Sequence, residues 1–205
     1  MKKKIVVIDY DISNISSVIN AMKFVDSKIH VSCRKNDIKN ASHIIIPGVG
    51  AFKKGMENLE RLNLISKIIK AAEKGIPILG ICLGMQLLMK KSEEFGTNYG
   101  LGLITSNVIK VQNKNDAYAF HIGWSNIFKT KDTRLIHENE KTIPFYFNHS
   151  YAVDFSELDC ATSFVKLNRK LTASFEKDNI FGVQFHPEKS HQYGLRLLKR
   201  FVNLK

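Results

Sequence analysis

Short apolar runs alternate with helical patterns through the first half of the chain, and this alternation restricts the fold more than any other feature. The runs are uninterrupted and rich in Ile and Val, as in strands that are buried on both faces of a sheet. We expect strands near 5–8, 29–31, 44–46 and 78–81, and helices over about 14–25 and about 53–74. Buried strands joined by helices form a parallel sheet that is covered on both faces.

The second half has a different pattern, with extended segments and few helices. Expected strands lie near 106–111, 120–124, 145–153, 171–175 and 180–184, followed by a last helix over about 193–202. This half is therefore antiparallel or mixed, and Leu197, Leu198 and Phe201 recur at the spacing of core-facing helix residues. With 205 residues and 44% hydrophobic content, residues 1–205 are predicted to form a single α/β domain with a mixed, largely parallel central sheet and helices on both faces.

The composition narrows the class of protein. The cysteines Cys33, Cys82 and Cys160 are widely spaced and include no C-x-x-C pair, so neither a disulfide framework nor a metal site is predicted. The formal net charge is +12, but the lysines that supply most of it are scattered, so no nucleic-acid partner is predicted. The first apolar run ends at Asp9, and no stretch approaches the roughly 18 apolar residues of a membrane span. We expect a cytoplasmic protein that uses no membrane and no cofactor.

The stretch Gly80-Ile-Cys82-Leu-Gly84 places a cysteine where a strand turns directly into a helix. Small residues on both sides of such a turn let it strain and lift one side chain above the sheet, as in nucleophile elbows. In parallel sheets the chemistry gathers beyond the carboxyl ends of the strands, where the loop Pro47-Gly-Val-Gly50 is also expected. Taken alone, the stretch is equally consistent with a buried core cysteine.

A second informative segment ends an apolar strand with His186, Pro187 and Glu188. Residues two apart on an extended chain point to the same side, so the histidine and the glutamate are expected to be close. A thiol needs a base to become a thiolate, and the base needs a third group that holds its ring. Cys82, His186 and Glu188 supply these three roles.

Five segments together resemble the class I, triad-type glutamine amidotransferases. They are Ile46-Pro-Gly-Val-Gly50, Gly80-Ile-Cys-Leu-Gly-Met-Gln86, His121-Ile-Gly-Trp124, His149-Ser-Tyr151 and Gln184-Phe-His-Pro-Glu-Lys-Ser190. The resemblance runs from the first expected strand to the last expected helix, and within the class it is greatest to the glutaminase subunits of imidazole glycerol phosphate synthases. It implies a flavodoxin-like fold, L-glutamine as the substrate and ammonia as the product that is delivered to a partner.

By this resemblance Cys82 is the nucleophile, His186 is the general base and then the acid, and Glu188 orients His186. The backbone N–H groups of Val49 and Leu83 are expected to form an oxyanion hole. The implied substrate-binding residues are Gly48, Gly50, Gln86, Glu94, His149, Ser150 and Tyr151. Among them, Gln86 shares a helix face with Cys82, and Glu94 is expected to meet the amino group of glutamine. No metal site is implied.

The resemblance also implies a β/α-barrel synthase subunit that forms a heterodimer with the chain and receives ammonia through a channel. His121 and Trp124 belong to the implied contact segment. Three positions depart from the family pattern: Asp11 and Ser13 replace glycines, and Ser125 stands where asparagine is usual. These departures leave open whether the ammonia serves histidine biosynthesis or another biosynthesis, such as the amidination of a nucleotide sugar.

Two alternatives belong to other functional classes, a cysteine peptidase of similar fold and a catalytically silent binding module. A peptidase does not need a pocket that is specific for a free amino acid. A silent module is expected to lack part of the triad, but this chain keeps Cys82, His186 and Glu188. A glutaminase is therefore the favoured interpretation.

Overall fold

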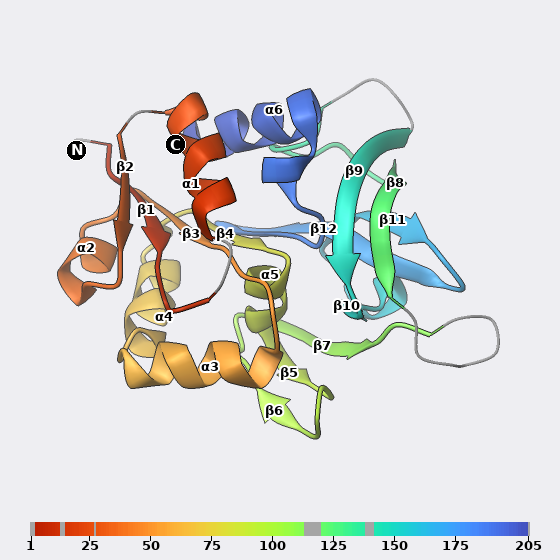
Figure 1. The fold of residues 1–205 in the computed structure, drawn as a ribbon, viewed down its shortest axis with the longest axis horizontal. Helices are drawn as coiled ribbons and strands as arrows, with labels where there is room; N and C mark the ends of the chain where they lie inside the picture. Colours follow the sequence, from red (N-terminus) through yellow and green to blue (C-terminus); the bar gives the residue numbers. More distant parts are fainter. Residues whose placement is uncertain (1–2, 13–14, 27, 113–119, 138–141, 205) are drawn as a thin grey trace.

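A nine-stranded sheet forms the centre of the molecule, with strand order β2-β1-β3-β4-β13-β12-β11-β8-β9 (Figure 1). The computed structural model describes residues 3–12, 15–26, 28–112, 120–137 and 142–204. The parallel half of the sheet contains β2 (Ile29–Ser32), β1 (Ile5–Ile8), β3 (His43–Ile46), β4 (Ile78–Ile81) and β13 (Ile180–Val183). The antiparallel half continues with β12 (Lys170–Lys177), β11 (Ala161–Lys166), β8 (His121–Lys129) and β9 (Thr142–His149). The predicted α/β fold with a mixed sheet is confirmed.

Alternate side chains of β1 pack against helices on opposite faces of the sheet. Ile5 and Val7 share a core with α1 (Ile15–Val25) and α6 (His191–Val202). Val6 and Ile8 belong to a second core with α3 (Phe52–Arg61), α4 (Ile65–Glu73) and α5 (Leu83–Leu87), and α2 (Lys35–Lys39) joins β2 to β3. In Figure 1, α1 and α6 lie above the sheet, whereas α3 and α4 lie below it. Among the residues that the structure describes, no helix is long and apolar enough to cross a lipid bilayer.

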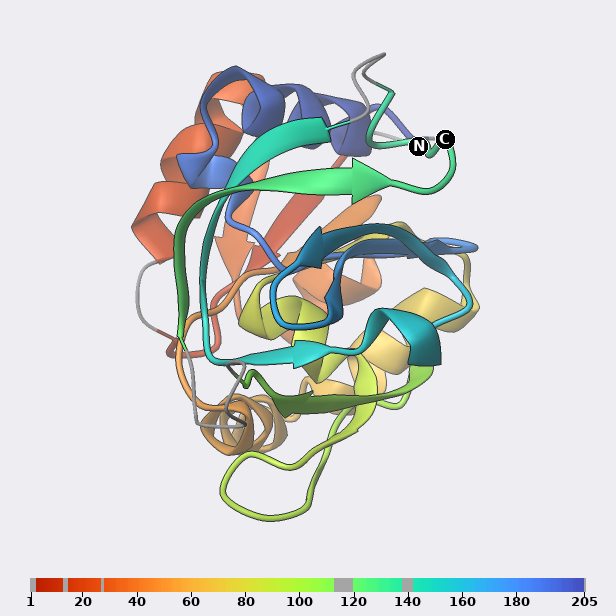
Figure 2. The same cartoon turned by 90° about the vertical axis from the view of Figure 1, so that its right-hand side faces the viewer.

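A second, four-stranded sheet has the order β10-β7-β5-β6. Its strands are β10 (Tyr151–Val153), β7 (Ile104–Lys110), β5 (Met89–Ser92) and β6 (Asn98–Tyr99), and the short helix η1 (Phe155–Glu157) follows β10. Only Ser150 separates the end of β9 from the start of β10, so the chain passes from the large sheet to the small one within a single residue. Figure 2 shows this passage, with β10 beside β7.

The structure corrects several expected element boundaries. The helical region over 53–74 is two helices, because Asn63 takes a φ of 54° and interrupts it. The helix that follows Cys82 is short, since α5 ends at Leu87 and Met89 begins β5, and the extended segment 145–153 is two strands of different sheets. The elements α2, β5, β6 and β11 were not predicted, because most of them are short and lack a continuous apolar run. Asn14, the expected start of the first helix, lies outside the described residues.

Candidate active site

Cys82 lies in a strained turn between β4 and α5. Its φ of 52° and ψ of −109° fall outside the regions that L-residues usually adopt. The flanking glycines allow close approach of the backbone: a Cβ on Gly80 would lie 2.6 Å from the carbonyl oxygen of Gly84, and a Cβ on Gly84 would overlap the carbonyl oxygen of Ile46. The strand-to-helix elbow expected from this segment is therefore present.

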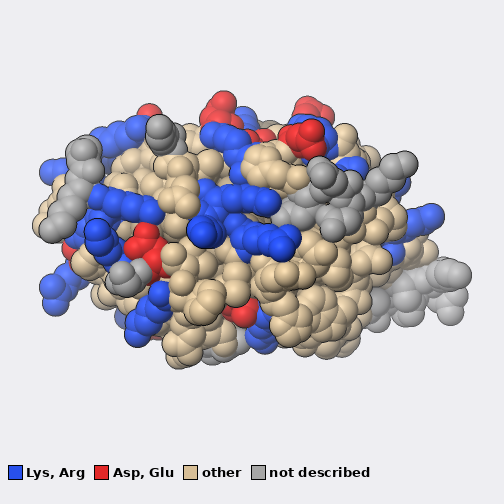
Figure 3. Space-filling model, turned by 90° about the horizontal axis from the view of Figure 1, so that it is seen from above, with Lys and Arg blue, Asp and Glu red and all other residues tan. Residues whose placement is uncertain are grey.

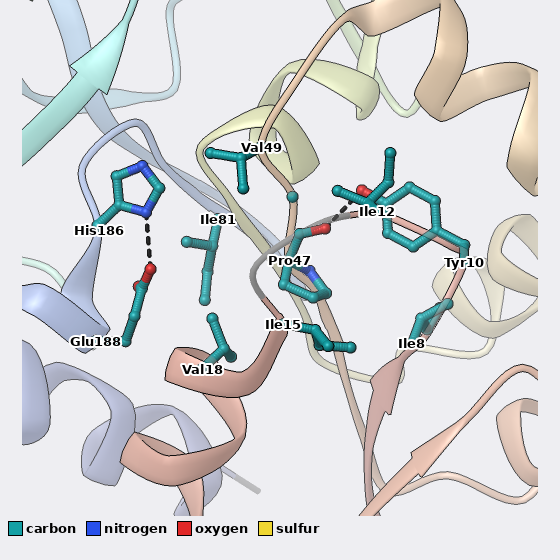
Figure 4. Close-up of a pocket in the computed structure, with 11 residues that line it drawn as sticks. Ile8, Tyr10, Ile12, Ile15, Val18, Pro47, Val49, Ile81, His186 and Glu188 are labelled. Atoms are coloured by element: carbon teal, nitrogen blue, oxygen red, sulfur yellow. Dashed lines mark hydrogen bonds and ion pairs between the residues drawn. The ribbon is translucent and has the colours of Figure 1, made fainter.

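Parallel strand pairing brings the histidine to the cysteine. β4 and β13 are neighbours with Ile81 opposite Val183, so both strands end at the same edge of the sheet. Cys82 follows β4, and His186 follows β13 just before the short helix η2 (Pro187–Lys189). The Nδ1 atom of His186 lies 2.7 Å from Oε1 of Glu188, and both side chains are 2% exposed. Figure 4 shows this pair beside Ile81 and Val49.

The carboxylate determines how the histidine ring is protonated. Because Glu188 Oε1 accepts a hydrogen bond, Nδ1 of His186 carries a proton and Nε2 is left to serve the thiol. Nε2 is buried and has no hydrogen-bond partner among the described residues. Burial opposes a charged ring, but interactions with Cys82 and Glu188 outweigh it and raise the pKa of His186 to about 10. The arrangement therefore favours an imidazolium next to the sulfur.

A pocket of about 240 Å³ opens at Cys82. It is lined by Val49, Gly50, Cys82, Leu83, Gln86, Glu94, Phe120, Asn148, His149, Ser150 and Tyr151. Every substrate-binding residue expected from the sequence is among them except Gly48. In this structure a Cβ on Gly48 would lie 2.5 Å from the hydroxyl oxygen of Tyr10, which packs against the loop. Gly48 thus allows close packing of the loop and does not line the pocket.

Two polar side chains in the pocket are already engaged with the protein. Gln86 Nε2 donates to the carbonyl oxygen of Tyr151 at 2.8 Å and to Gln184 Oε1 at 3.1 Å, so both amide hydrogens are used and only Oε1 can serve a ligand. Glu94 Oε2 accepts a hydrogen bond from the backbone N–H of Phe52 at 2.6 Å. Burial raises the pKa of Glu94, although this hydrogen bond opposes the rise. A cationic amino group would relieve the buried carboxylate.

The expected oxyanion hole has a different arrangement in this structure. The N–H of Leu83 donates to the carbonyl oxygen of Gly48 at 3.3 Å. In a trans peptide the carbonyl and the next N–H point in opposite directions, so the N–H of Val49 points away from Leu83. One expected donor is thus occupied and the other is turned away. Rotation of the Gly48–Val49 peptide plane would change both at once.

The loop is held from behind by Tyr10. Its hydroxyl donates to the carbonyl oxygen of Pro47 at 2.5 Å, one peptide before the plane that would rotate (Figure 4). Burial, together with the nearby Cys82, raises the pKa of Tyr10, so the hydroxyl keeps its proton. On the other side of the plane, Gly50 has a φ of 122°, and a Cβ added there would meet nothing within 4 Å, so backbone conformation alone calls for glycine.

Two histidines form a buried pair next to the pocket. His121 Nδ1 lies 2.9 Å from His149 Nε2, and His121 Nε2 lies 2.8 Å from Ser125 Oγ. Burial lowers the pKa of His121 to about 4, and burial together with His121 lowers the pKa of His149 to about 3. Both rings are therefore neutral at pH 7.

We expect the free energy of unfolding to fall as the pH is lowered from 7 to 5.5. Histidines of the unfolded chain have a pKa of about 6.5 and gain protons in this window, whereas His121 and His149 stay neutral in the folded protein. The pKa of His43 is also lowered by burial. His186 acts in the opposite direction: its raised pKa contributes stability that is fully present below about 6.5 and is lost as the pH rises through about 10. The effect of the histidines with lowered pKa values on the free energy of unfolding outweighs the effect of His186.

The fully buried His149 alone is expected to lower the free energy of unfolding by about 1 kcal/mol between pH 7 and pH 5.5. Urea unfolding midpoints at pH 7 and pH 5.5 measure it, and carboxylates with ordinary pKa values contribute little because they titrate at lower pH. A double variant, His121→Gln with His149→Gln, should lose less stability over the same step. A wild-type midpoint that is equal or higher at pH 5.5 would contradict a neutral histidine pair.

The pocket rim, which begins at Phe120 and continues along β8, carries exposed aromatic and aliphatic side chains. Phe120 is 66% exposed, Ile122 61% and Trp124 48%, and the indole of Trp124 stacks on the ring of His191 with centroids 5.0 Å apart. Asp11, which follows β1, adopts a φ of 60°, so an aspartate takes here the left-handed conformation that glycine would allow. Ser13 lies outside the described residues.

Basic side chains are spread over much of the surface. Figure 3 shows lysines and arginines across the face seen from above in Figure 1, with acidic side chains among them. Asp11 pairs with Arg61, and Arg134 pairs with Glu176. On this face the positive charge is thus distributed and not gathered in one patch.

Several residues that the structure places at the site had no role predicted from the sequence. Gln184 Nε2 lies 3.6 Å from Cys82 Sγ, and the carbonyl oxygen of Asn148 lies 3.8 Å from the same atom. Gln184 belongs to a motif that carried the resemblance, but its position alone gives no chemistry. Tyr10 and Phe120 carried no signal, since one aromatic residue beside a strand is usually a core residue.

Comparisons with known proteins agree with this geometry. Residues 6–204 match the sequence model described as glutamine amidotransferase class-I. The chain is 38% identical over 201 residues to the imidazole glycerol phosphate synthase subunit HisH 2 of Pseudomonas aeruginosa, covering 98% of this chain and 99% of that protein. It is 40% identical to subunit HisH of Lactococcus lactis, covering 98% of each chain. Subunit HisH of Methanocaldococcus jannaschii is 39% identical, with 97% of this chain and 98% of that protein covered.

Solved structures with low sequence identity share the fold. The structure of PurLQS from Thermotoga maritima superposes with a TM-score of 0.73 at 22% identity, covering 99% of each chain. A structure described as a glutamine amidotransferase gives a TM-score of 0.73 at 16% identity, with 97% of this chain and 99% of that chain covered.

Proposed function

The chain belongs to the class I glutamine amidotransferase family, and we propose that it is the glutaminase subunit of an imidazole glycerol phosphate synthase, formed by one amidotransferase domain over residues 1–205. The observation that carries this proposal is the match to HisH subunits at 38% to 40% identity over nearly the whole length. The pocket at Cys82 supports it, because it offers a nucleophile, a buried carboxylate at Glu94 and a strand end at His149 to a small amino acid.

Hydrolysis proceeds in two stages through a thioester. The Cys82 thiolate attacks the side-chain amide carbon of glutamine, and His186 gives its Nε2 proton to the nitrogen as the C–N bond breaks, so ammonia leaves. Water then attacks the thioester while His186 takes up its proton. The C–S bond breaks, which releases glutamate and restores the thiolate. Glu188 keeps the ring of His186 in the orientation that both stages need.

The oxyanion of each stage needs the N–H groups of Val49 and Leu83. In the resting arrangement the carbonyl of Gly48 occupies the N–H of Leu83, so the site is poorly equipped for the reaction. Rotation of one peptide plane would expose both donors, and each donor accounts for roughly 3 kcal/mol of barrier. A partner that favours the rotated plane therefore stimulates the enzyme.

The partner that fits this role is a β/α-barrel synthase subunit, which forms a heterodimer with the chain and receives ammonia through a channel. The exposed side chains of Phe120, Ile122 and Trp124 supply an apolar docking surface at the pocket rim. Transfer through an enclosed interface keeps ammonia unprotonated, and only the unprotonated form is a nucleophile. Docking at the rim also places the partner next to the loop that carries Val49.

The test measures glutamate release from glutamine by the chain alone and with the barrel synthase. We expect a weak activity that rises about 100-fold or more with the partner, as gaining oxyanion donors implies. The alternative acceptor is favoured by Asp11 and Ser125, which depart from the family pattern. Restored growth of a histidine auxotroph that lacks its own glutaminase subunit supports the histidine pathway. Failure to complement, together with copurification with a sugar-modifying amidotransferase, would assign the ammonia to that biosynthesis.

Replacing Gly50 with Val should lower the partner-stimulated activity at least about tenfold and change glutamine affinity little. Gly50 has a φ of 122°, which a β-branched residue does not adopt, so the variant restrains the neighbouring Val49 peptide. Stimulated kcat and glutamine binding are measured separately. Gly75→Val is the matched control, since Gly75 also has a positive φ, of 75°, but lies at the end of α4. Equal losses of kcat and affinity would indicate a purely structural turn.

A further inference from the structure

A continuous chain of hydrogen bonds runs from Ser125 on β8 to the sulfur of Cys82. Between Ser125 and Tyr151, Ser125 Oγ lies 2.8 Å from His121 Nε2, His121 Nδ1 lies 2.9 Å from His149 Nε2, and His149 Nδ1 lies 2.9 Å from the Tyr151 carbonyl oxygen. Between Tyr151 and Cys82, the same carbonyl oxygen lies 2.8 Å from Gln86 Nε2, and Gln86 Nε2 lies 3.1 Å from Gln184 Oε1. Gln184 Nε2 lies 3.6 Å from Cys82 Sγ. The side chains between the two ends are buried. They are therefore shielded from competing water.

The carbonyl of Tyr151 determines the orientation of both glutamine side chains. A carbonyl oxygen only accepts, so the Gln86 atom that contacts it must be the NH₂ group. The second hydrogen of that group points to Gln184, so the Gln184 atom there must be the amide oxygen. The other end of the same amide, its NH₂ group, then faces Cys82 Sγ. The order of donors and acceptors leaves no alternative for the amide of Gln184.

The same carbonyl determines the state of both histidines. His149 Nδ1 must donate to it, so His149 Nε2 in a neutral ring accepts. His121 Nδ1 therefore donates to His149, and His121 Nε2 accepts a hydrogen bond from the hydroxyl of Ser125. All the links between Ser125 and Tyr151 thus run in one direction. Reversing any of them would leave two donors or two acceptors facing each other.

We propose that Gln184 directs an N–H at the sulfur of Cys82 and stabilises the thiolate, and that Gln86 and the carbonyl of Tyr151 hold its amide in that orientation. The inference rests on the proposed function, since a thiolate is needed for amide cleavage. A donor to the sulfur favours its charged form. The hydrogen bonds on the other side of the carbonyl end at Ser125 on β8, next to Trp124, so a partner docked at this rim contacts the strand at the far end of the chain.

Other titratable groups also face the sulfur and stay unchanged in the test. His186 and Tyr10 interact with Cys82, Glu188 contacts His186, and Glu94 and His149 line the same pocket. Gln184→Met is the informative variant, because methionine has a similar length and no N–H to donate. Any change in thiolate formation in this variant is therefore due to the missing amide.

The experiment follows alkylation of Cys82 by iodoacetamide as a function of pH, with mass spectrometry to separate the Cys82 peptide from those of Cys33 and Cys160. In Gln184→Met, the pH of half-maximal rate should rise by about one unit, which lowers the rate about tenfold on the acid side. Gln192→Met is the matched control, since Gln192 is exposed on α6, and it should leave the profile unchanged. A Gln184→Met profile that coincides with the wild type overturns the proposal.

Gln86→Met tests what holds the amide and remains informative if Gln184→Met fails to fold. It removes the donor to Gln184 Oε1, so the amide can turn and a smaller shift in the same direction is expected. No shift in Gln86→Met contradicts the assignment of the orientation to Gln86 and Tyr151. The proposed function is tested separately by glutamate release with the synthase partner, since alkylation requires no glutamine. A shifted profile in a protein that never hydrolyses glutamine would refute the function and leave the role of Gln184 standing.

Discussion

A Cys82→Ala variant assembled with its synthase partner is expected to release no measurable glutamate from glutamine, yet to form product when ammonium salt is added. The thiol liberates ammonia but takes no part in its use, so only the glutamine-dependent reaction depends on it. Loss of a nucleophile typically costs about 10⁴-fold or more in kcat. Glutamate release and product formation are measured in parallel with both nitrogen sources.

The other cysteines provide matched controls for this variant. Cys33 is exposed and Cys160 is half-buried, and neither lines the pocket, so Cys33→Ala and Cys160→Ala should retain glutamine-dependent activity. Turnover of glutamine in Cys82→Ala at a rate near that of the wild type would refute the assigned nucleophile. Loss of the ammonium-dependent reaction as well would point to a disrupted complex and not to missing chemistry.

Gly84→Ala should destabilise the fold strongly and abolish glutaminase activity. The added Cβ would overlap the backbone carbonyl oxygen of Ile46, which cannot move without displacing β3. The helix α5 must therefore shift away from the sheet and carry the Cys82 elbow with it. The expected loss is about 3 kcal/mol of unfolding free energy, which urea unfolding at pH 7 measures.

Gly55→Ala is the control for this variant, since it also adds one methyl group to a helix. Its Cβ would meet the side-chain ends of Leu87 at 3.1 Å and of Leu83 at 3.5 Å, and these can rotate away. Alanine is also favoured over glycine in a helix by about 1 kcal/mol. The control should therefore stay within about 1 kcal/mol of the wild type. Similar unfolding energies for the two variants would show that the contact between α5 and β3 tolerates an added carbon.

Elements that a few neighbouring residues are enough to indicate were predictable from the sequence. The strands around Ile5–Ile8 and Ile78–Ile81 are continuous apolar runs because both of their faces are covered, and such runs are visible without a structure. Cys82 was visible in the same way, because the glycines beside it mark a strained turn. The strand β5 was not predictable, because only its end residues are buried and its pairing with β7 brings together distant parts of the chain.

Features that depend on which way a backbone or side-chain group points could not be predicted from the sequence. The resemblance indicated Val49 and Leu83 as oxyanion donors, but a sequence does not reveal which way the Gly48 carbonyl points. The role assigned to Gln184 depends on a backbone carbonyl from a strand that is remote in sequence. The substrate-binding role expected of Gly48 stays a prediction: Gly48 does not line the pocket at Cys82, and a Cβ there would meet the hydroxyl oxygen of Tyr10.

Because the chain passes from one sheet to the other at Ser150, residues that bind the substrate are separated from residues that react with it. Cys82 and His186 follow strands of the large sheet, whereas Tyr151 begins a strand of the small sheet and Glu94 follows another. A local opening of the small sheet would release a substrate while the reactive pair stays assembled on the larger one. Selection can therefore alter how tightly glutamine is held without rebuilding the nucleophile, and a lineage can adjust its nitrogen supply to a new acceptor while the bond-breaking machinery stays the same.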